Sequence, residues 1–288
     1  MSDERGTSLG ILAGGGTLPG RVAAAAAAGG RDVFMVGLEG FADPVVLAPY
    51  PHAFARVGAA GRIRDLLRAH ACRELVLVGS VRRPSLLDLR PDALAARLLG
   101  RIGRRAFAGD DGLLAAIVRV LNDEGFTVLG VEKVLREAVG PAGLLSRAAP
   151  DAAAMADIER GVAVARALGG VDVGQGCVVQ QGMVLAVEAA EGTDAMLARA
   201  GALARPGPGG VLVKLVKPGQ DRRADLPTVG PETVRLAASA ALRGIAFEAG
   251  GTLIVDRALA VDAADAAGLF LLGLDPATLG PMSEGGSG

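Results

Sequence analysis

The stretch LGILAGGGTLPG, residues Leu9–Gly20, sets the fold of the first half of the chain. Its apolar run Leu9–Ala13 predicts a buried strand, and Gly14–Gly16 then lead into a helix that begins near residue 18 or 19. Glycine lets backbone N–H groups come close to an anion, and a helix N-terminus adds favourable partial charge. The stretch therefore predicts a strand, a phosphate or nucleotide site and a helix, with a tight turn that holds no ligand as the alternative.

The glycine spacing departs from the dinucleotide-binding pattern. In G-x-G-x-x-G the third glycine would fall at Pro19, although Glu39 lies near the position of a ribose-binding acid. The pattern thus favours nucleotide or phosphate binding in general over NAD(P) in particular.

In both halves of the chain, short apolar runs alternate with helical patterns. Runs at 33–37, 75–79 and 127–131 predict further strands, and room for crossover helices between them indicates a parallel, Rossmann-like sheet. The second half predicts another α/β domain. We expect a nucleotide-binding domain at residues 1–132, a linker at 133–150, a C-terminal α/β catalytic domain at 151–280 and a disordered tail at 281–288.

Composition narrows the class of protein. A chain of 288 residues holds about two domains, and 51% hydrophobic against 21% charged residues indicates that it folds. A net charge of -1 with no Trp argues against nucleic acid as the main partner. Two cysteines and two histidines are too few for a disulfide scaffold or a zinc cage. We see no signal peptide and no transmembrane run, so we expect a cytoplasmic protein.

A charged loop follows the predicted strand at 211–216. From Lys214 to Asp225 it gathers two lysines, two arginines and two aspartates beside the end of a buried strand. Lysine or arginine neutralises phosphate oxygens, and carboxylates hold a divalent metal or orient a water. The loop predicts phosphoryl chemistry, and a salt-bridged surface loop is the alternative.

Two further features are open to a functional interpretation. Glu188 ends an otherwise apolar strand, where a buried carboxylate without a partner would be costly. The stretch RLLGRIGRR, Arg97–Arg105, is basic and amphipathic, which favours a solvated helix face, with an anionic membrane surface as the alternative.

Three segments resemble the UDP-2,3-diacylglucosamine pyrophosphatase family of lipid A biosynthesis, of the type unrelated to metallophosphoesterases. They are the opening LGILAGGGTLPG, VGQGCVVQQGMVLAVEAAEGTDAML at 173–197, and VLVKLVKPGQDRRADLPTVGPETV at 211–234. The resemblance implies a Mg2+-dependent hydrolase, with Mn2+ as the alternative ion. It also implies water attack at the β-phosphorus, which yields UMP and 2,3-diacylglucosamine 1-phosphate, with the substrate held between two domains.

The resemblance also places the essential acid at Asp225. Lys214 is the second catalytic candidate, and Asp225 with Asp221 are the metal candidates. The substrate-binding candidates are Gly14, Gly15, Gly16, Gly79, Ser80, Asn122, Gln175, Glu188, Asp221, Arg223 and Thr228.

A lipid-linked substrate implies a peripheral location on the cytoplasmic face of the inner membrane. Whether the protein forms a homodimer is left open. The rival functions are a non-catalytic nucleotide-binding regulatory module and an NAD(P)-dependent oxidoreductase, neither of which needs an acid beside a lysine-bearing strand.

Overall fold

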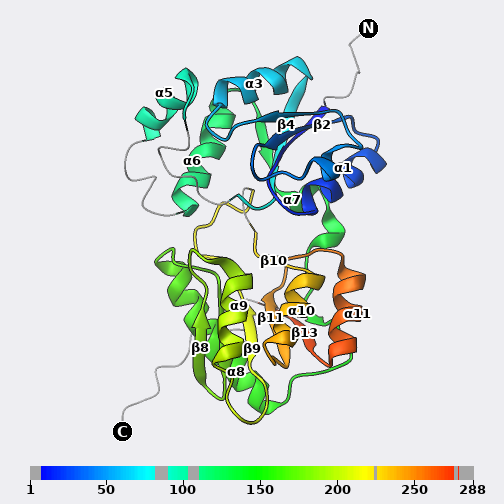
Figure 1. The fold of residues 1–288 in the computed structure, drawn as a ribbon, viewed down its shortest axis with the longest axis vertical. Helices are drawn as coiled ribbons and strands as arrows, with labels where there is room; N and C mark the ends of the chain where they lie inside the picture. The colour runs from blue at the N-terminus through cyan, green and yellow to red at the C-terminus, as the bar shows by residue number, and fades with distance from the viewer. Residues whose placement is uncertain (1–7, 82–89, 103–109, 224–225, 276–277, 279–288) are drawn as a thin grey trace. The chain divides into compact units, whose positions relative to one another are not determined.

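The computed structural model describes residues 8–81, 90–102, 110–223, 226–275 and 278 (Figure 1). These residues form two compact units. One holds the chain up to Arg136 together with 221–223, and the other holds Glu137–Gln220 with the residues from Leu226 onward. The point where the units divide lies inside the expected linker at 133–150.

A five-stranded parallel sheet organises the N-terminal unit. Its strand order is β3-β2-β1-β4-β5, and every neighbouring pair is parallel. The Rossmann-like parallel sheet expected from the sequence is thereby confirmed. The strands are β1 (Ser8–Ala13), β2 (Val33–Leu38), β3 (His52–Ala55), β4 (Cys72–Val78) and β5 (Thr127–Leu129).

The hydrophobic pattern of the sequence did not predict strand β3. It is a four-residue edge strand whose only buried residue is Ala55, so it shows no apolar run. An edge strand needs little burial to pair, and hydrophobic pattern therefore detects it poorly.

Helices pack onto this sheet through small apolar faces. Ile63 and Leu67 of α3 lie in one cluster with Phe34 and Val36 of β2, whereas α1 contacts β1 and β2 and has its own buried residues, which include Val22. The helices are α1 (Leu18–Ala28), α2 (Pro44–Leu47), α3 (Ala60–Ala69), α5 (Ala93–Ile102), α6 (Asp110–Asp123) and α7 (Val131–Val134).

The C-terminal unit is built on a mixed six-stranded sheet of order β6-β13-β11-β9-β7-β8. The central strands β9, β11 and β13 are parallel, while β7, β8 and β6 run antiparallel to their neighbours. The strands are β6 (Gly143–Leu144), β7 (Gly176–Gln180), β8 (Met183–Val187), β9 (Val211–Lys214), β11 (Gly244–Glu248) and β13 (Phe270–Leu274). A separate parallel pair joins β10 (Thr228–Val229) to β12 (Leu253–Ile254).

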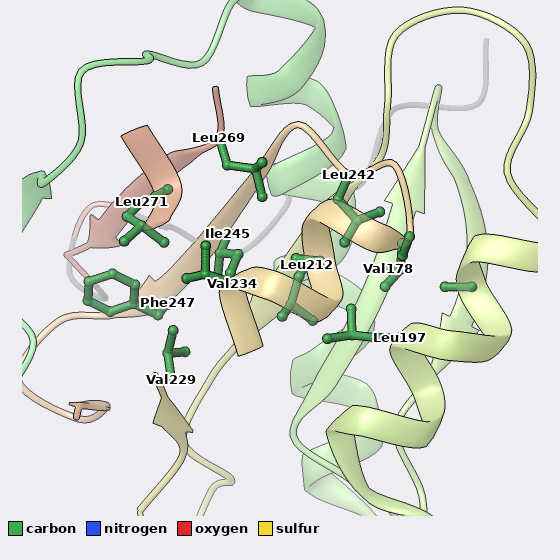
Figure 2. Close-up of a cluster of buried hydrophobic side chains, with 14 of the residues drawn as sticks. Val178, Leu197, Leu212, Val229, Val234, Leu242, Ile245, Phe247, Leu269 and Leu271 are labelled. Carbon is green, nitrogen blue, oxygen red and sulfur yellow. The ribbon is translucent and has the colours of Figure 1, made fainter. Parts of the chain in front are cut away.

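Helices cover both faces of this second sheet. The helix α8 (Ala152–Gly170) packs on one face, where Ile158 and Val162 meet strand residues such as Val179 and Val213. The other face carries α9 (Gly192–Ala202), α10 (Pro231–Ser239) and α11 (Arg257–Ala267). Figure 2 shows part of that second core, in which Leu197 of α9 and Val234 of α10 lie close to the strands. This packing holds the strand ends that carry the candidate active site.

Candidate active site

The candidate active site lies in the C-terminal unit, at the edge of the sheet where β9 ends. The strand register places Lys214, the last residue of β9, opposite Gly176 of β7. On the other side of Gly176, the N–H of Glu188 donates to the Gly176 carbonyl oxygen at 2.8 Å. Because directly opposite residues of antiparallel strands share a face, Lys214 and Glu188 flank Gly176 on one face of the sheet.

Gly176 provides the space in which the two charged side chains meet. A Cβ atom on Gly176 would lie 2.6 Å from Glu188 Oε2 and 3.6 Å from Lys214 Cγ. The first of these distances is shorter than real Cβ contacts allow. A glycine is therefore required here for the arrangement of Glu188.

A hydroxyl links the two charges. The Lys214 ammonium donates to Thr193 Oγ1 at 2.6 Å, and Thr193 Oγ1 donates to Glu188 Oε1 at 2.8 Å. A longer bond of 3.4 Å runs from Lys214 Nζ to the carbonyl oxygen of Thr228. The direct separation between Lys214 Nζ and Glu188 Oε2 is 4.0 Å.

The cluster is buried and incompletely satisfied. Lys214 is 3% exposed and Glu188 is 7% exposed, so both charges have left water and need partners in the protein. Glu188 Oε2 nevertheless has no hydrogen-bond partner. Buried polar atoms are normally hydrogen-bonded, and an exception indicates a place for a water, an ion or a substrate group.

Thr228 contacts this cluster through its backbone, whereas Gln175 is next to it in the chain but directs its side chain away from it. The Gln175 carbonyl oxygen accepts from Leu215 N–H at 2.9 Å, which extends the β7–β9 ladder by one residue. Strand alternation then directs the Gln175 side chain to the face opposite Gly176, where its Oε1 is buried without a partner. Thr228 takes part through its backbone oxygen, since its hydroxyl donates to the Leu226 carbonyl at 3.2 Å.

The charged loop is only partly described. Asp225 lies outside the described residues. Asp221 binds Arg223 with both carboxylate oxygens, at 2.9 Å to Nε and 2.7 Å to one terminal nitrogen. This guanidinium holds the pKa of Asp221 below its ordinary value. The Asp221 carboxylate is thus already engaged, and metal binding would have to displace Arg223.

The glycine-rich loop lies at the other place where chemistry was expected, in the N-terminal unit. The sheet order reverses between β1 and β4, and ligands of open α/β sheets bind at such a switch point. Gly14–Gly16 follow β1 there, and Gly79 and Ser80 follow β4. Glu39 follows β2, on the other side of β1, and is exposed.

Three backbone hydrogen bonds join this loop to the end of β4 and the residues that follow it. Gly14 N–H donates to Val78 O, Gly15 N–H donates to Ser80 O, each at 2.8 Å, and Ser80 N–H donates to Gly15 O at 3.0 Å. A Cβ on Gly14 would lie 2.7 Å from the Gly79 carbonyl. These glycines thus allow two loops to touch, and the N–H groups of Gly14 and Gly15 already have acceptors. The remaining feature for an anion is the N-terminus of α1.

Asn122 does not join these residues. It is exposed near the C-terminal end of α6, five residues before β5 begins. The loop after β1 and the loop after β4 lie where parallel strands end, so Asn122 lies at the opposite edge of the sheet. Its role in substrate binding remains a prediction that this geometry does not favour.

The residues of the membrane and metal predictions are described only in part. Arg97 is exposed on α5 beside an open groove of about 760 Å³, whereas residues 103–105 of the basic stretch lie outside the described residues. None of the helices in the described ranges has the length and apolar character to cross a bilayer. Within those same ranges, His, Cys, Asp and Glu nowhere gather in a group of three or more that could hold a metal ion.

Sequence reasoning overlooked two members of the cluster. Thr193 stands in EGTDAML and Gly176 in VGQGC, both within the segment 173–197 that carries the resemblance. A threonine after a β-strand carries no signal by itself. Its role depends on α9 packing back against β7 and β8, which only the tertiary structure shows.

The described residues form a two-domain α/β protein with a buried lysine–carboxylate cluster in its C-terminal unit. The LpxI N-terminal domain profile matches residues 8–138, and the LpxI C-terminal domain profile matches residues 141–272. A relative described as UDP-2,3-diacylglucosamine pyrophosphatase LpxI, from Caulobacter vibrioides, is 44% identical over 274 residues, which cover 93% of this chain and 98% of the relative. The chain belongs to the LpxI family.

Proposed function

We propose that this chain hydrolyses the pyrophosphate bond of UDP-2,3-diacylglucosamine in lipid A biosynthesis and releases UMP and 2,3-diacylglucosamine 1-phosphate. The name of the Caulobacter relative, at 44% identity over nearly its whole length, supports this substrate. Membership of the LpxI family through both halves of the chain supports it as well.

The observation that carries the proposal is the unpartnered Glu188 Oε2 beside the buried Lys214 ammonium. Charge concentrates on phosphoryl oxygens during transfer, and a fixed cation in a water-poor site stabilises it more than it could in bulk water. Lys214 supplies this cation. Glu188 Oε2 can accept a hydrogen bond from the attacking water and so orient it toward phosphorus.

The donor set suits Mg2+, with Mn2+ as the alternative. Magnesium prefers oxygen ligands and uses one or two carboxylates together with substrate phosphates, so it needs no His or Cys cage. Asp225 and Asp221 of the charged loop are the carboxylates that would hold the ion, and Asp221 would first have to leave Arg223. When bound, the ion would polarise the phosphoryl oxygens.

The direction of attack follows from the same assignment. If Lys214 and Glu188 face the sugar-linked phosphoryl group, water adds at the β-phosphorus and UMP is the leaving group.

A lipid-linked substrate also supports a peripheral location at an anionic membrane. Arginines of the stretch Arg97–Arg105 would contact the lipid head groups. Co-sedimentation with vesicles containing anionic lipid, compared with neutral vesicles, tests this part separately. Equal partition into both vesicle types would contradict it.

The decisive experiment is to incubate the purified protein with Mg2+ and UDP-2,3-diacylglucosamine and to measure release of UMP. Chelation followed by dialysis should abolish the turnover, and added Mg2+ should restore it. In water enriched in heavy oxygen, the label should appear in 2,3-diacylglucosamine 1-phosphate. Label in UMP would reverse the direction of attack, and absence of UMP would contradict the function itself.

A further inference from the structure

Thr193 contributes a hydroxyl to the buried cluster from a separate element. It is half-buried in the first turn of α9, directly after Gly192, whose φ of 80° turns the chain into the helix. Helix N-termini often use a threonine hydroxyl to cap their own N–H groups. Here the hydroxyl instead bonds with Lys214, at the end of β9, and with Glu188, directly after β8.

The direction of both bonds follows from the available protons. An ammonium group only donates, and a hydroxyl has one proton to give. Thr193 Oγ1 accepts from Lys214 Nζ at 2.6 Å, so its single proton goes to Glu188 Oε1 at 2.8 Å. The chain of bonds therefore runs in one direction, from the lysine through the threonine to the glutamate.

This relay separates the two charges. A direct ammonium–carboxylate bond has a length of about 2.8 Å, whereas Lys214 Nζ and Glu188 Oε2 are 4.0 Å apart. At that distance the groups still attract each other, but neither occupies the other's hydrogen-bonding position. The unpartnered state of Glu188 Oε2 is the direct result.

We propose that Thr193 is a positioning residue for the hydrolysis, whose hydroxyl keeps Lys214 and Glu188 linked without letting them close into a contact pair. The inference rests on the proposed function, because it assigns Lys214 to the phosphoryl oxygens and Glu188 Oε2 to the attacking water. Without the hydroxyl, the two side chains are close enough to neutralise each other. The site would then still bind substrate but would lack the charges that act in the transition state.

The test compares Thr193→Val with Thr193→Ser. Valine keeps the shape of threonine and removes the hydroxyl, so kcat should fall by about 10- to 100-fold, as expected for lost bonds to charged groups, while KM changes by less than about threefold. Serine keeps the hydroxyl and should restore kcat to within about threefold of the wild type. The matched control is Thr233→Val, since Thr233 is a half-buried threonine in the first turn of α10 whose hydroxyl accepts from Gly230 N–H.

A second background tests whether Thr193 acts through Lys214. In a Lys214→Met protein the Thr193→Val change should have less than about a threefold effect on the residual single-turnover rate, because residues acting as a unit are non-additive. Thermal unfolding of each variant shows whether it is folded at the assay temperature. If the valine variant is not folded, Thr193→Ala takes its place in both comparisons.

The inference would be overturned by wild-type kcat in the folded valine or alanine variant, by failure of serine to restore kcat, or by a change in KM alone. An undiminished Thr193 effect in the Lys214→Met background would overturn it too. A wild-type protein that releases no UMP contradicts the proposed function instead, so the two failures are distinguishable.

Discussion

The glycine-rich loop of the N-terminal unit and the lysine cluster of the C-terminal unit were both expected to meet phosphate, yet they are built differently. In the loop, N–H groups of Gly14, Gly15 and Ser80 find backbone acceptors within the unit. In the cluster, Glu188 Oε2 has none. A segment whose polar groups satisfy one another needs no ligand, whereas a buried unsatisfied oxygen is a cost that a ligand can remove.

Glycine content alone is therefore a weak predictor of a phosphate site. Gly14 and Gly79 are needed because two loop backbones touch, and Gly176 is needed because two side chains meet above it. The same residue type therefore serves packing in one unit and the candidate active site in the other.

Replacing Lys214 by Met should produce the largest effect and most directly tests this contrast. Losing a fixed cation at developing phosphoryl charge should lower kcat by about a thousandfold, measured as UMP release. Lys217→Met is the matched control, because Lys217 is also buried but pairs with Asp172 at 2.7 Å. It should lower the melting temperature more than it lowers kcat, and equal losses of kcat in both variants would remove the distinction.

Asp225→Asn should come next, with a loss in kcat of about a hundredfold at nearly unchanged melting temperature. The change keeps the size of the side chain and removes its charge, so the affinity for substrate should fall less than kcat. Asp221→Asn is the comparison, and it should cost less because the Asp221 carboxylate is already held by Arg223. A larger loss for Asp221→Asn would move the metal role to that residue.

A pair of glycine substitutions separates packing from chemistry. In Gly176→Ala the new methyl group meets the end of the Glu188 side chain, so kcat should fall by about tenfold with a small change in stability. In Gly14→Ala it meets the Gly79 backbone, which cannot move aside, so stability should fall by about 2 kcal/mol or more. Melting curves and UMP release measured on both proteins check the pair, and the reverse pattern would contradict it.

The smallest effects concern helix caps, one in each unit. Asp92 accepts from the N–H groups of Gly61 and Ala95, at the starts of α3 and α5, whereas Asp151 caps only α8 through Ala154 N–H. Asp92→Ala should cost about 2 kcal/mol, and Asp151→Ala should cost less because Asp151 caps one helix and is exposed. Denaturant unfolding followed by hydrogen exchange in each unit measures both, and equal costs would contradict the double cap.

Both caps also predict a pH dependence. Burial alone would raise the pKa of Asp92, but the N–H donors outweigh it, and the pKa of Asp92 lies below its ordinary value. The pKa of Asp151 is lowered chiefly by the Ala154 N–H and further by Arg243. Depressed carboxyl pKa values add stability above the ordinary pKa, and this stability is lost as the pH falls below about 4. The alanine variants should show a weaker loss in that range.

Two α/β domains, the parallel sheet of the first domain and the family were all predictable from the sequence. Apolar runs such as Val33–Leu38 are buried on both faces, and this pattern is visible without coordinates. It also pointed to Lys214 and Glu188, because a charge at the end of an apolar strand is unusual enough to notice. Edge strands such as β3 were not predicted, because few of their side chains are buried.

Only the tertiary structure decided which of the candidate residues meet. Lys214, Gly176 and Glu188 come together through strand register, and Thr193 joins them because α9 packs back against the sheet. The register of antiparallel strands depends on long-range pairing and not on local composition. Tertiary structure likewise showed that Gly14 and Gly15 N–H groups are already bonded, because the Gly79–Ser80 loop is distant in sequence and adjacent in space.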